Sequence, residues 1–434
     1  MAQPDPAGLK IRPLSIWVKP GLTGTNVATV LFGSFSTIAL IVIMGLLQPY
    51  ILNEILHVPT ETQGGVTGRL ALLQEIVTIA LVGFMGAWSD RVGRRRVYVL
   101  GFAMLGLGYL VYPLATTETQ LILFRCVFAV GAAAAPVMLS TTIQDTPQEV
   151  SRGKWVGLNN ICQGLGVVIL ATAFLAQAPE WFTNAGFDPV TSGRYAFWLA
   201  TGLCIVAAIV LSAGLEKSAN IQKSTTSITR QLGEGLQAGM KNPRLALAFG
   251  AAFIGRGDLV VVGSFLTLWV TQHGIDTGLS TAESVAKAGM LFGIVQLAAM
   301  GWAFFMGMIA DRINRVTGLC IALAAACAGY TLMGLVEDPF GGMMIPAALL
   351  LGVGEISVIV AGGALLGQEA GTRKRGAIVG SFNLAGGIGI MFGGYVGGLV
   401  FDAIGRTAPF IMMGIFNGLL LLLGLVVWRK ARWK

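Results

Sequence analysis

Ionic side chains are scarce in this sequence of 434 residues. Only 12% of them are charged, against roughly 25% in an ordinary soluble domain. Because a surface that faces water needs polar or ionic groups, this composition excludes a cytosolic enzyme, a disulfide-stapled secreted domain and a disordered tail protein. Hydrophobic residues make up 55% of the chain and the mean hydropathy is +0.75. The sequence therefore predicts a polytopic membrane protein.

Residues that carry enzyme chemistry or bind metals are also few. The two histidines, His57 and His273, have no acid at metal-ligand spacing, and the five cysteines form no CxxC pair. The HExxH, GxxxxGK[ST], GxGxxG and GxSxG patterns are missing. We therefore expect no enzyme activity, cofactor or metal site. The net charge of +8 is explained by cations that set membrane orientation, so we expect no nucleic-acid partner.

Glycine and long apolar runs are abundant instead. The 60 glycines show no collagen period and fit close helix packing in lipid. A spanning helix needs about 20 largely apolar residues. Stretches of this kind lie at 27–48, 67–88, 97–115, 121–143, 155–177, 195–215, 245–271, 287–309, 317–336, 343–366, 376–401 and 407–428. They predict twelve transmembrane helices.

The cations predict the orientation of these spans. With both termini inside, 23 of the 29 Lys and Arg residues fall in inner segments and 4 in outer segments. The other two, Arg125 and Arg256, lie within spans. Because Lys and Arg are retained on the cytoplasmic side, we expect both termini to be cytoplasmic and the protein to lie in the cell inner membrane.

The longest polar connection divides the chain into two halves. We expect a cytoplasmic N-terminal tail over 1–26 with an interfacial segment, and a six-helix bundle over 27–215. A cytoplasmic linker over 216–244, a second bundle over 245–428 and a cytoplasmic tail over 429–434 follow. Apolar residues recur every four positions in the linker, at Ile228, Leu232, Leu236 and Met240. They predict a short amphipathic helix on the inner membrane surface, and the alternative is a solvated linker with chance spacing.

The two halves carry matching motifs. Gly86 to Arg94, with Asp90 and Arg91, recurs from Gly307 to Arg315 at an offset of 221. A second block recurs at an offset of 223, where Gly157, Asn160, Gly164 and Gly166 match Gly380, Asn383, Gly387 and Gly389. Because several matches share a nearly constant offset, the halves are predicted to be duplicates. We expect Asn160 and Asn383 to share a structural role where the halves meet.

With these motifs the chain resembles the major facilitator superfamily of secondary transporters over about residues 27–428. The GxxxDRxGRRR stretch at 86–96 carries the resemblance, with Arg125 and Gly131 similar to the arginine motif of the fourth span. It implies an all-α integral membrane fold of twelve helices in two six-helix bundles around a central cavity. The sequence departs from the pattern at Trp88 and at Asn314, although Asn tolerates the left-handed turn of the glycine that it replaces.

The Gly86 motif is expected to act as an inner latch. A glycine near the end of span 2 allows a neighbouring helix to approach closely. Asp90 can face the N-terminus of a following helix and pair with Arg91 or Arg94. The resemblance implies a gating role for Gly86, Asp90, Arg91, Gly93 and Arg94, and for the copies Asp311 and Arg312. Alternatively, the arginines only anchor the topology and bind anionic lipid, which we favour for Arg95 and Arg96.

Ionisable residues inside spans are costly and mark candidate functional sites. The sequence places five there, which are Glu75, Arg125, Arg256, Asp258 and Glu355. An acid buried without a full partner binds protons readily, so we expect Glu355 or Asp258 to couple protons by changing its pairing with Arg256. Arg256 either neutralises Glu355 or holds an anionic substrate group, and its Gly-Arg-Gly-Asp run is expected to weaken the helix.

The roles expected for Arg125 and Glu75 are less specific. A role of Arg125 in proton movement is implied only by the resemblance, and Glu75 is either a snorkelling helix-end acid or functional. We predict a monomeric transporter of a small organic solute, preferably an organic anion, which works by alternating access with H⁺ as coupling ion. A drug exporter is the alternative, weakened because span 5 lacks the proline signature of drug/proton antiporters. A receptor or assembly protein would need a sizeable soluble domain.

Overall fold

The computed structural model describes residues 8–11, 14–216, 228–370 and 375–432. Within them, twelve helices are long and apolar enough to cross a membrane. This confirms the twelve predicted spans and the all-α membrane fold. Two compact units are formed, one by the described parts of 1–56 and 76–224 and the other by those of 57–75 and 225–434. We call them unit 1 and unit 2.

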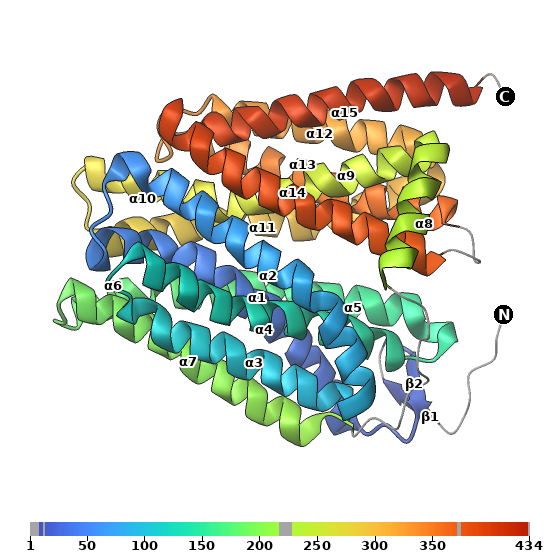
Figure 1. The fold of residues 1–434 in the computed structure, drawn as a ribbon, viewed down its shortest axis with the longest axis horizontal. Coiled ribbons are helices and arrows are strands. Elements are labelled where there is room, and N and C mark those ends of the chain that lie inside the picture. The colour runs from blue at the N-terminus through green and yellow to red at the C-terminus, as the bar shows by residue number, and fades with distance from the viewer. Residues whose placement is uncertain (1–7, 12–13, 217–227, 371–374, 433–434) are drawn as a thin grey trace. The chain divides into compact units, whose positions relative to one another are not determined.

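Unit 1 contains the first six spans, apart from the start of the second. Its elements are β1 (Gly8–Ile11), β2 (Ile16–Pro20), α1 (Gly24–Tyr50), α2 (Gln63–Val92), α3 (Arg94–Val111), α4 (Glu118–Asp145), α5 (Arg152–Gly166), α6 (Ala178–Asn184) and α7 (Pro189–Gly214). Short 3-10 turns lie at 112–114, 149–151 and 175–177, and π-helical segments extend α1 over 51–55 and α5 over 167–174; a further 3-10 turn at 60–62 precedes α2 and belongs to unit 2. In Figure 1 the long helices of this unit run side by side.

Unit 2 contains the last six spans and a linker helix. Its elements are α8 (Ile228–Lys241), α9 (Pro243–Val260), α10 (Thr267–Asp276), α11 (Thr281–Arg312), α12 (Arg315–Gly334), α13 (Met344–Glu369), α14 (Arg375–Ala403) and α15 (Ala408–Arg432). A π-helical segment over 261–266 joins α9 to α10. Helix α2 is continuous, yet its residues 63–75 pack within unit 2 and its remainder within unit 1. The sequence predicted that the whole of this helix lies in the first bundle, over 27–215, and did not predict its division between the two units.

The N-terminal segment is a β-hairpin seated on the connection between α4 and α5. Strands β1 and β2 pair antiparallel, with Lys10 opposite Trp17. The Trp17 N–H donates to Ser151 Oγ at 2.8 Å, and the Lys19 N–H donates to the Thr146 carbonyl at 3.0 Å. Ile16 is buried by this contact. Backbone pairing therefore fixes a segment for which the sequence predicted only an interfacial position.

Matched glycines bring helices into backbone contact in both units. A Cβ at Gly166 of α5 would lie 1.7 Å from the carbonyl oxygen of Phe35 in α1. The repeat-related Gly389 of α14 would lie 1.9 Å from that of Phe253 in α9. Because no side chain fits into either space, these positions need glycine. The duplicated sequence thus builds the same helix contact twice.

The linker forms the predicted helix α8. Its Gly235 packs against the Ala377 carbonyl of α14, and its Gly239 packs against the ring of Phe249 in α9. Two of the four apolar residues of the predicted stripe, Leu236 and Met240, are exposed, and Met240 is 82% exposed. The side chains of residues 228–232 lie outside the described part of the chain. The position of α8 on a membrane surface stays a prediction.

Candidate functional site

Arg256 is an exposed cation in the interior of span α9. Its aliphatic stem lies across Gly386 of α14, where a Cβ would be 2.9 Å from Arg256 Cγ. One guanidinium nitrogen, Nη2, donates to Asn383 Oδ1 at 3.3 Å. The flanking glycines do not break the helix, because α9 is regular through 255–258 and the irregular π-helical segment begins only at Val261. Gly386 and Asn383 thus position the guanidinium on α14.

The acid that interacts electrostatically with Arg256 is Glu75 of α2. Glu75 is 8% exposed. Among the described residues, no ion pair within 4.0 Å involves either side chain. The expected pairing of Arg256 with Glu355 or Asp258 is therefore wrong. The physical reason is helix rotation: two positions along α9 turn Asp258 about 200° away from Arg256, so the two residues face different helices.

Asp258 and Glu355 instead belong to a buried polar cluster. Asp258 is 0% exposed and Glu355, on α13, is 2% exposed. Asn417 Nδ2 on α15 donates to both Asp258 carboxylate oxygens, at 3.3 and 3.2 Å. Tyr330 of α12 is also 0% exposed and lies in the same buried region. In the described part of the chain, Glu355 Oε2 and the Tyr330 hydroxyl have no hydrogen-bond partner.

Neither Asn417 nor Tyr330 was predicted from the sequence as part of a site. Asn417 is a lone amide in the strongly apolar stretch 407–428, and a polar side chain in such a run normally finds a buried partner. That signal was available for Asn417. Tyr330 gave no comparable signal, because the large apolar ring of a tyrosine fits an apolar run.

Residues 63–75 of α2, which we call the strap, lie on α14 and end at Glu75. The Gly64 and Gly65 N–H groups donate to the Asp402 carboxylate at 2.8 and 2.6 Å. One turn further, a Cβ at Gly68 would be 2.8 Å from the Gly394 carbonyl. An acid at the N-terminus of a helix accepts hydrogen bonds from the unpaired N–H groups of that helix, and its negative charge interacts favourably with the helix dipole. The strap is therefore fastened to α14 at its first two turns.

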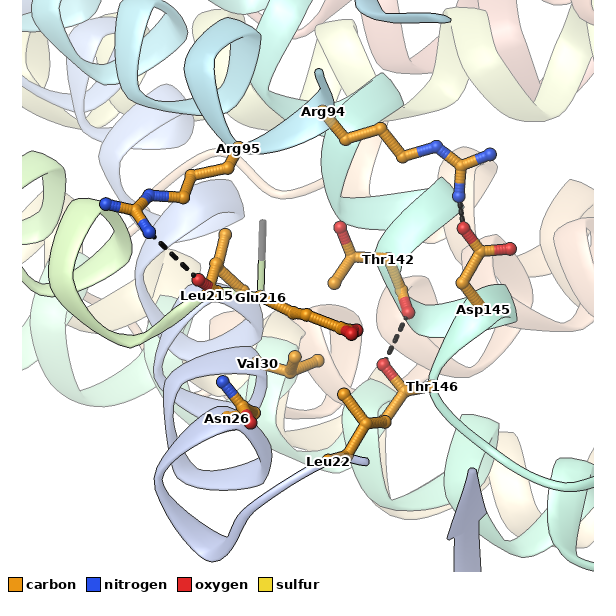
Figure 2. A pocket seen from close by; sticks show the side chains of 10 residues that line it. All are labelled: Leu22, Asn26, Val30, Arg94, Arg95, Thr142, Asp145, Thr146, Leu215 and Glu216. Carbon is orange, nitrogen blue, oxygen red and sulfur yellow. Dashed lines mark hydrogen bonds and ion pairs between the residues drawn. The ribbon is translucent and has the colours of Figure 1, made fainter. Parts of the chain in front are cut away.

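The Gly86 to Arg94 motif, for which a latch was predicted, has an ion-pair partner that was not predicted. Arg94 forms an ion pair with Asp145 at the end of α4. Figure 2 shows both side chains pointing toward each other at a pocket of about 90 Å³. Asp90 interacts with Arg94 only electrostatically. Gly93 has φ +98°, the left-handed geometry that suits glycine. Asp145, rather than Asp90, is thus the direct partner of Arg94.

Other expectations for the latch differ from the structure. Within the described part of unit 1, no atom lies within 4 Å of a Cβ built at Gly86, so no helix of its own unit closely approaches it. Arg91 and Arg312 are exposed. Asp311 pairs with Arg315 at 3.1 Å. Asn314 has φ −57° rather than a left-handed value, and its Oδ1 accepts the Val316 N–H at 2.9 Å. The second turn thus uses a side-chain cap where the first uses a glycine.

Arg125 and the matched asparagines complete the predicted set. Arg125 is 6% exposed, and its guanidinium lies 5.7 Å from the ring of Tyr112 and 5.6 Å from that of Phe128. Aromatic faces therefore surround this cation. Asn160 accepts a 3.4 Å bond from Gln163 of its own helix, whereas Asn383 accepts from Arg256. The two asparagines do not make the same contact, because α9 carries Arg256 whereas α1, the corresponding helix of unit 1, has no arginine.

Comparisons with known proteins agree with this architecture. The family model described as Major Facilitator Superfamily matches residues 29–339 and 280–433. Magnetosome protein MamH of Paramagnetospirillum magneticum is 27% identical over 383 residues, which cover 86% of this chain and 85% of that protein. Magnetosome protein MamZ of the same organism is 28% identical, and the match covers 85% of this chain and 57% of the longer MamZ.

A resistance protein and two solved structures are also similar. Tetracycline resistance protein, class G, of Vibrio anguillarum is 26% identical over 78% of this chain and 81% of that protein. The nucleoside transporter NupG superposes with a TM-score of 0.71 at 15% identity, over 94% of this chain and 99% of NupG. A bacterial homolog of the lysosomal transporter Spinster gives 0.64 at 17% identity, over 93% and 96%. The chain therefore belongs to the Major Facilitator Superfamily of membrane transporters and is a multi-pass membrane protein with twelve spans.

Proposed function

We propose that the chain is a secondary transporter that carries a small organic anion by alternating access and is driven by protons. The observation that carries this proposal is Arg256, an exposed guanidinium within a span. A guanidinium has five N–H donors, and the described residues accept from one nitrogen only, through Asn383. The remaining donors are available for a carboxylate or phosphate group, which guanidinium binds in a planar, bidentate arrangement.

The acids of unit 2 support the link to protons. Glu75, Asp258 and Glu355 lie within spans, where Arg256 is the cation that interacts with Glu75. A carboxylate that is buried without a cation is costly, whereas a neutral carboxylic acid with hydrogen-bond partners is not. Uptake of a proton is therefore the simplest way to balance these charges. Because Arg256 does not pair with Asp258 or Glu355, we propose that these two acids bind protons as a separate cluster with Asn417.

A flux screen tests the proposal. Purified chain in proteoliposomes, with an imposed pH gradient, is offered organic anions, sugars and cationic dyes. We expect proton-driven flux of an anion, lost in Arg256→Gln and retained in Lys241→Gln, which removes a cation outside the site. The double variant Glu355→Gln, Asp258→Asn should lose proton-driven flux. Full proton-driven transport by this variant would contradict the role of the two acids, and anion flux by Arg256→Gln would contradict the anion site.

Export of amphipathic drugs is the second candidate. The relatives named tetracycline resistance proteins favour it, among them the class G protein at 26% identity. The same screen separates the candidates, because a drug exporter would move the cationic dyes and would not need Arg256. A protein that moves no solute of the panel would favour the receptor or assembly class instead.

The position in the cell belongs to the same proposal. The excess of Lys and Arg in the segments assigned to the inside supports cytoplasmic termini and the cell inner membrane. We propose a monomer, because two six-helix units supply the complete architecture. Labelling of single cysteines placed at Leu56 and at Lys241 from either side of intact vesicles tests the orientation. Only Lys241→Cys should react with a membrane-impermeant thiol reagent from the cytoplasmic side.

A further inference from the structure

Oxygen atoms without hydrogen-bond partners gather around Asp258 in unit 2. Asn417 Nδ2 donates to both carboxylate oxygens of Asp258, at 3.3 and 3.2 Å, while Asn417 Oδ1 accepts from no group in the described part of the chain. Glu355 Oε2 and the Tyr330 hydroxyl also lack partners there. Each of these four side chains is at most 2% exposed. Because buried polar atoms are normally satisfied by protein, water or an ion, these oxygens need an occupant.

The register of α9 on α13 places the two acids at the same level. A Cβ at Gly362 of α13 would lie 3.1 Å from Ala251 Cβ of α9, and a Cβ at Gly255 of α9 would lie 3.3 Å from Val358 Cγ1 of α13. The two helices are thus antiparallel. Asp258 follows Gly255 by three residues, and the acid of α13 precedes Val358 by three residues. Both acids therefore continue the contact faces of their helices and lie opposite each other.

Helix α12 brings the phenol oxygen to this level. A Cβ at Gly354, the neighbour of Glu355, would lie 2.5 Å from Ala326 Cα of α12. Tyr330 lies one turn after Ala326, and long side chains in a helix lean back toward the N-terminus of that helix. The Tyr330 hydroxyl is thus directed toward the level of Glu355. Together with Asn417 of α15, four helices each contribute one oxygen-bearing side chain to the same buried place.

In the described part of the chain this cluster holds two acids and no cation. Neither Asp258 nor Glu355 forms an ion pair within 4.0 Å there. Arg256, on the same helix as Asp258, donates to Asn383 of α14 instead. A buried charge is tolerated when it is paired or coordinates a metal ion. Two carboxylates therefore need two positive charges, which two protons, or one proton and one monovalent metal ion, can supply.

The ligand set favours a hard monovalent cation. Asp258 offers two oxygens, and Glu355, Asn417 and Tyr330 offer one each. Sites built only from oxygen suit hard cations. Among these, Mg²⁺ usually keeps several waters and Ca²⁺ takes roughly six to eight oxygens. A closed site with fewer oxygens suits neither ion, whereas Na⁺ carries half their charge and leaves the second carboxyl free to keep a proton.

We propose that this cluster binds a sodium ion in place of one of its protons. The inference rests on the proposed proton binding by the same acids, because one carboxyl has to release its proton before the ion enters. One Na⁺ and one proton then balance Asp258 and Glu355, and the oxygens of Asn417 and Tyr330 complete the coordination. The ion joins α9, α12, α13 and α15, so it stabilises unit 2 as well as neutralising it.

Binding of radioactive sodium to the purified full chain, in detergent at neutral pH, tests the site. We expect saturable binding that unlabelled NaCl displaces and choline chloride does not. Tyr330→Phe removes one ligand oxygen and should lower the affinity at least ~10-fold. Tyr109→Phe removes the hydroxyl of an equally buried tyrosine in unit 1 and should bind as the unmodified chain does. No saturable binding, or equal affinity of Tyr330→Phe and the unmodified chain, would overturn the proposal.

Thermal unfolding gives a second measurement. NaCl should raise the Tm of the unmodified chain relative to choline chloride at equal ionic strength, because an ion that binds only the folded state stabilises it. The rise should vanish in Glu355→Gln, and a cooperative transition of this variant in choline chloride shows that it folds. A rise of the same size in Glu355→Gln would contradict the site.

The sodium site and the proposed proton coupling can fail separately. If sodium does not bind while the double variant Glu355→Gln, Asp258→Asn loses proton-driven flux, only the sodium site is wrong. If sodium binds and this double variant keeps full proton-driven flux, the sodium site is supported and the proposed role of the acids in coupling is wrong.

Discussion

Replacing Gly389 with alanine tests how rigidly α14 is held against α9. The new Cβ would lie 1.9 Å from the Phe253 carbonyl oxygen, whereas ordinary contact begins at 3.4 Å. The helices would have to separate by about 1.5 Å, because a backbone carbonyl cannot rotate away as a side chain can. Separation at one point also weakens neighbouring contacts along both helices.

The magnitude follows from this geometry. Overpacking in a core costs about 1–3 kcal/mol, and a clash with backbone belongs at the upper end, so we expect about 3 kcal/mol for Gly389→Ala. The repeat-related Gly166→Ala should cost about as much, since its Cβ would lie 1.7 Å from the Phe35 carbonyl oxygen. The two sites share no partner and lie in different units. Their effects should therefore add, to about 6 kcal/mol.

Thermal unfolding in detergent is the assay. Each alanine variant should lower the apparent Tm by about 6–12 °C if a unit responds like a domain of its size. Gly202→Ala and Gly363→Ala are matched controls in helices of unit 1 and unit 2, because no atom lies within 4 Å of a Cβ at either position. They should be neutral or stabilising by up to about 1 kcal/mol. A Tm of Gly389→Ala equal to that of Gly363→Ala would refute the argument.

Three further predictions concern polar contacts at helix ends. Asp402→Ala removes the acceptor of two strap N–H groups. Hydrogen exchange of the Gly64 and Gly65 amides should accelerate roughly 30-fold, which corresponds to a loss of about 2 kcal/mol in the free energy of local opening. Unchanged exchange would contradict the role of Asp402 in holding the strap. Asp145→Asn should lower the free energy of unfolding by less than about 1 kcal/mol, because Asp145 is half exposed. The double variant Arg94→Asp, Asp145→Arg, which exchanges the two charges, should restore the lost stability. A larger loss that the exchange does not restore would contradict the ion pair. Hydrogen bonds from Thr191 lower the pKa of Asp188. Stabilisation of the α7 start should therefore be present above about pH 4 and lost as the pH falls further. Circular dichroism against pH, with Asp188→Ala as the variant without this dependence, checks it.

Hydropathy predicted the spans because lipid leaves little choice. A backbone in hydrocarbon must satisfy its own hydrogen bonds, so each span needs a long apolar helix. The same constraint makes residues such as Glu75 and Arg256 conspicuous in the sequence. Their location inside spans was therefore predictable from the positions of the apolar stretches.

Their partners were not predictable in the same way. Which side chains meet depends on the rotation of each helix and on its neighbours, and neither is encoded in local periodicity. Glu75 lies in a helix assigned to the first half by sequence order, yet it packs within unit 2. Asp145 ends α4 far from the motif of Arg94. The short hairpin was missed because two strands of 4 and 5 residues give almost no periodic signal.

The seat of that hairpin has a consequence for how the chain is made. Trp17 is bonded to a residue 134 positions later in the sequence. During synthesis, the two N-terminal strands emerge first and can pair with each other, but the connection on which their hairpin sits exists only after the fourth helix has been made. Docking of the hairpin is thus a late event that depends on the intervening spans. A chain with a skipped or inverted span would leave the outer edge of the hairpin uncovered and open to proteolysis.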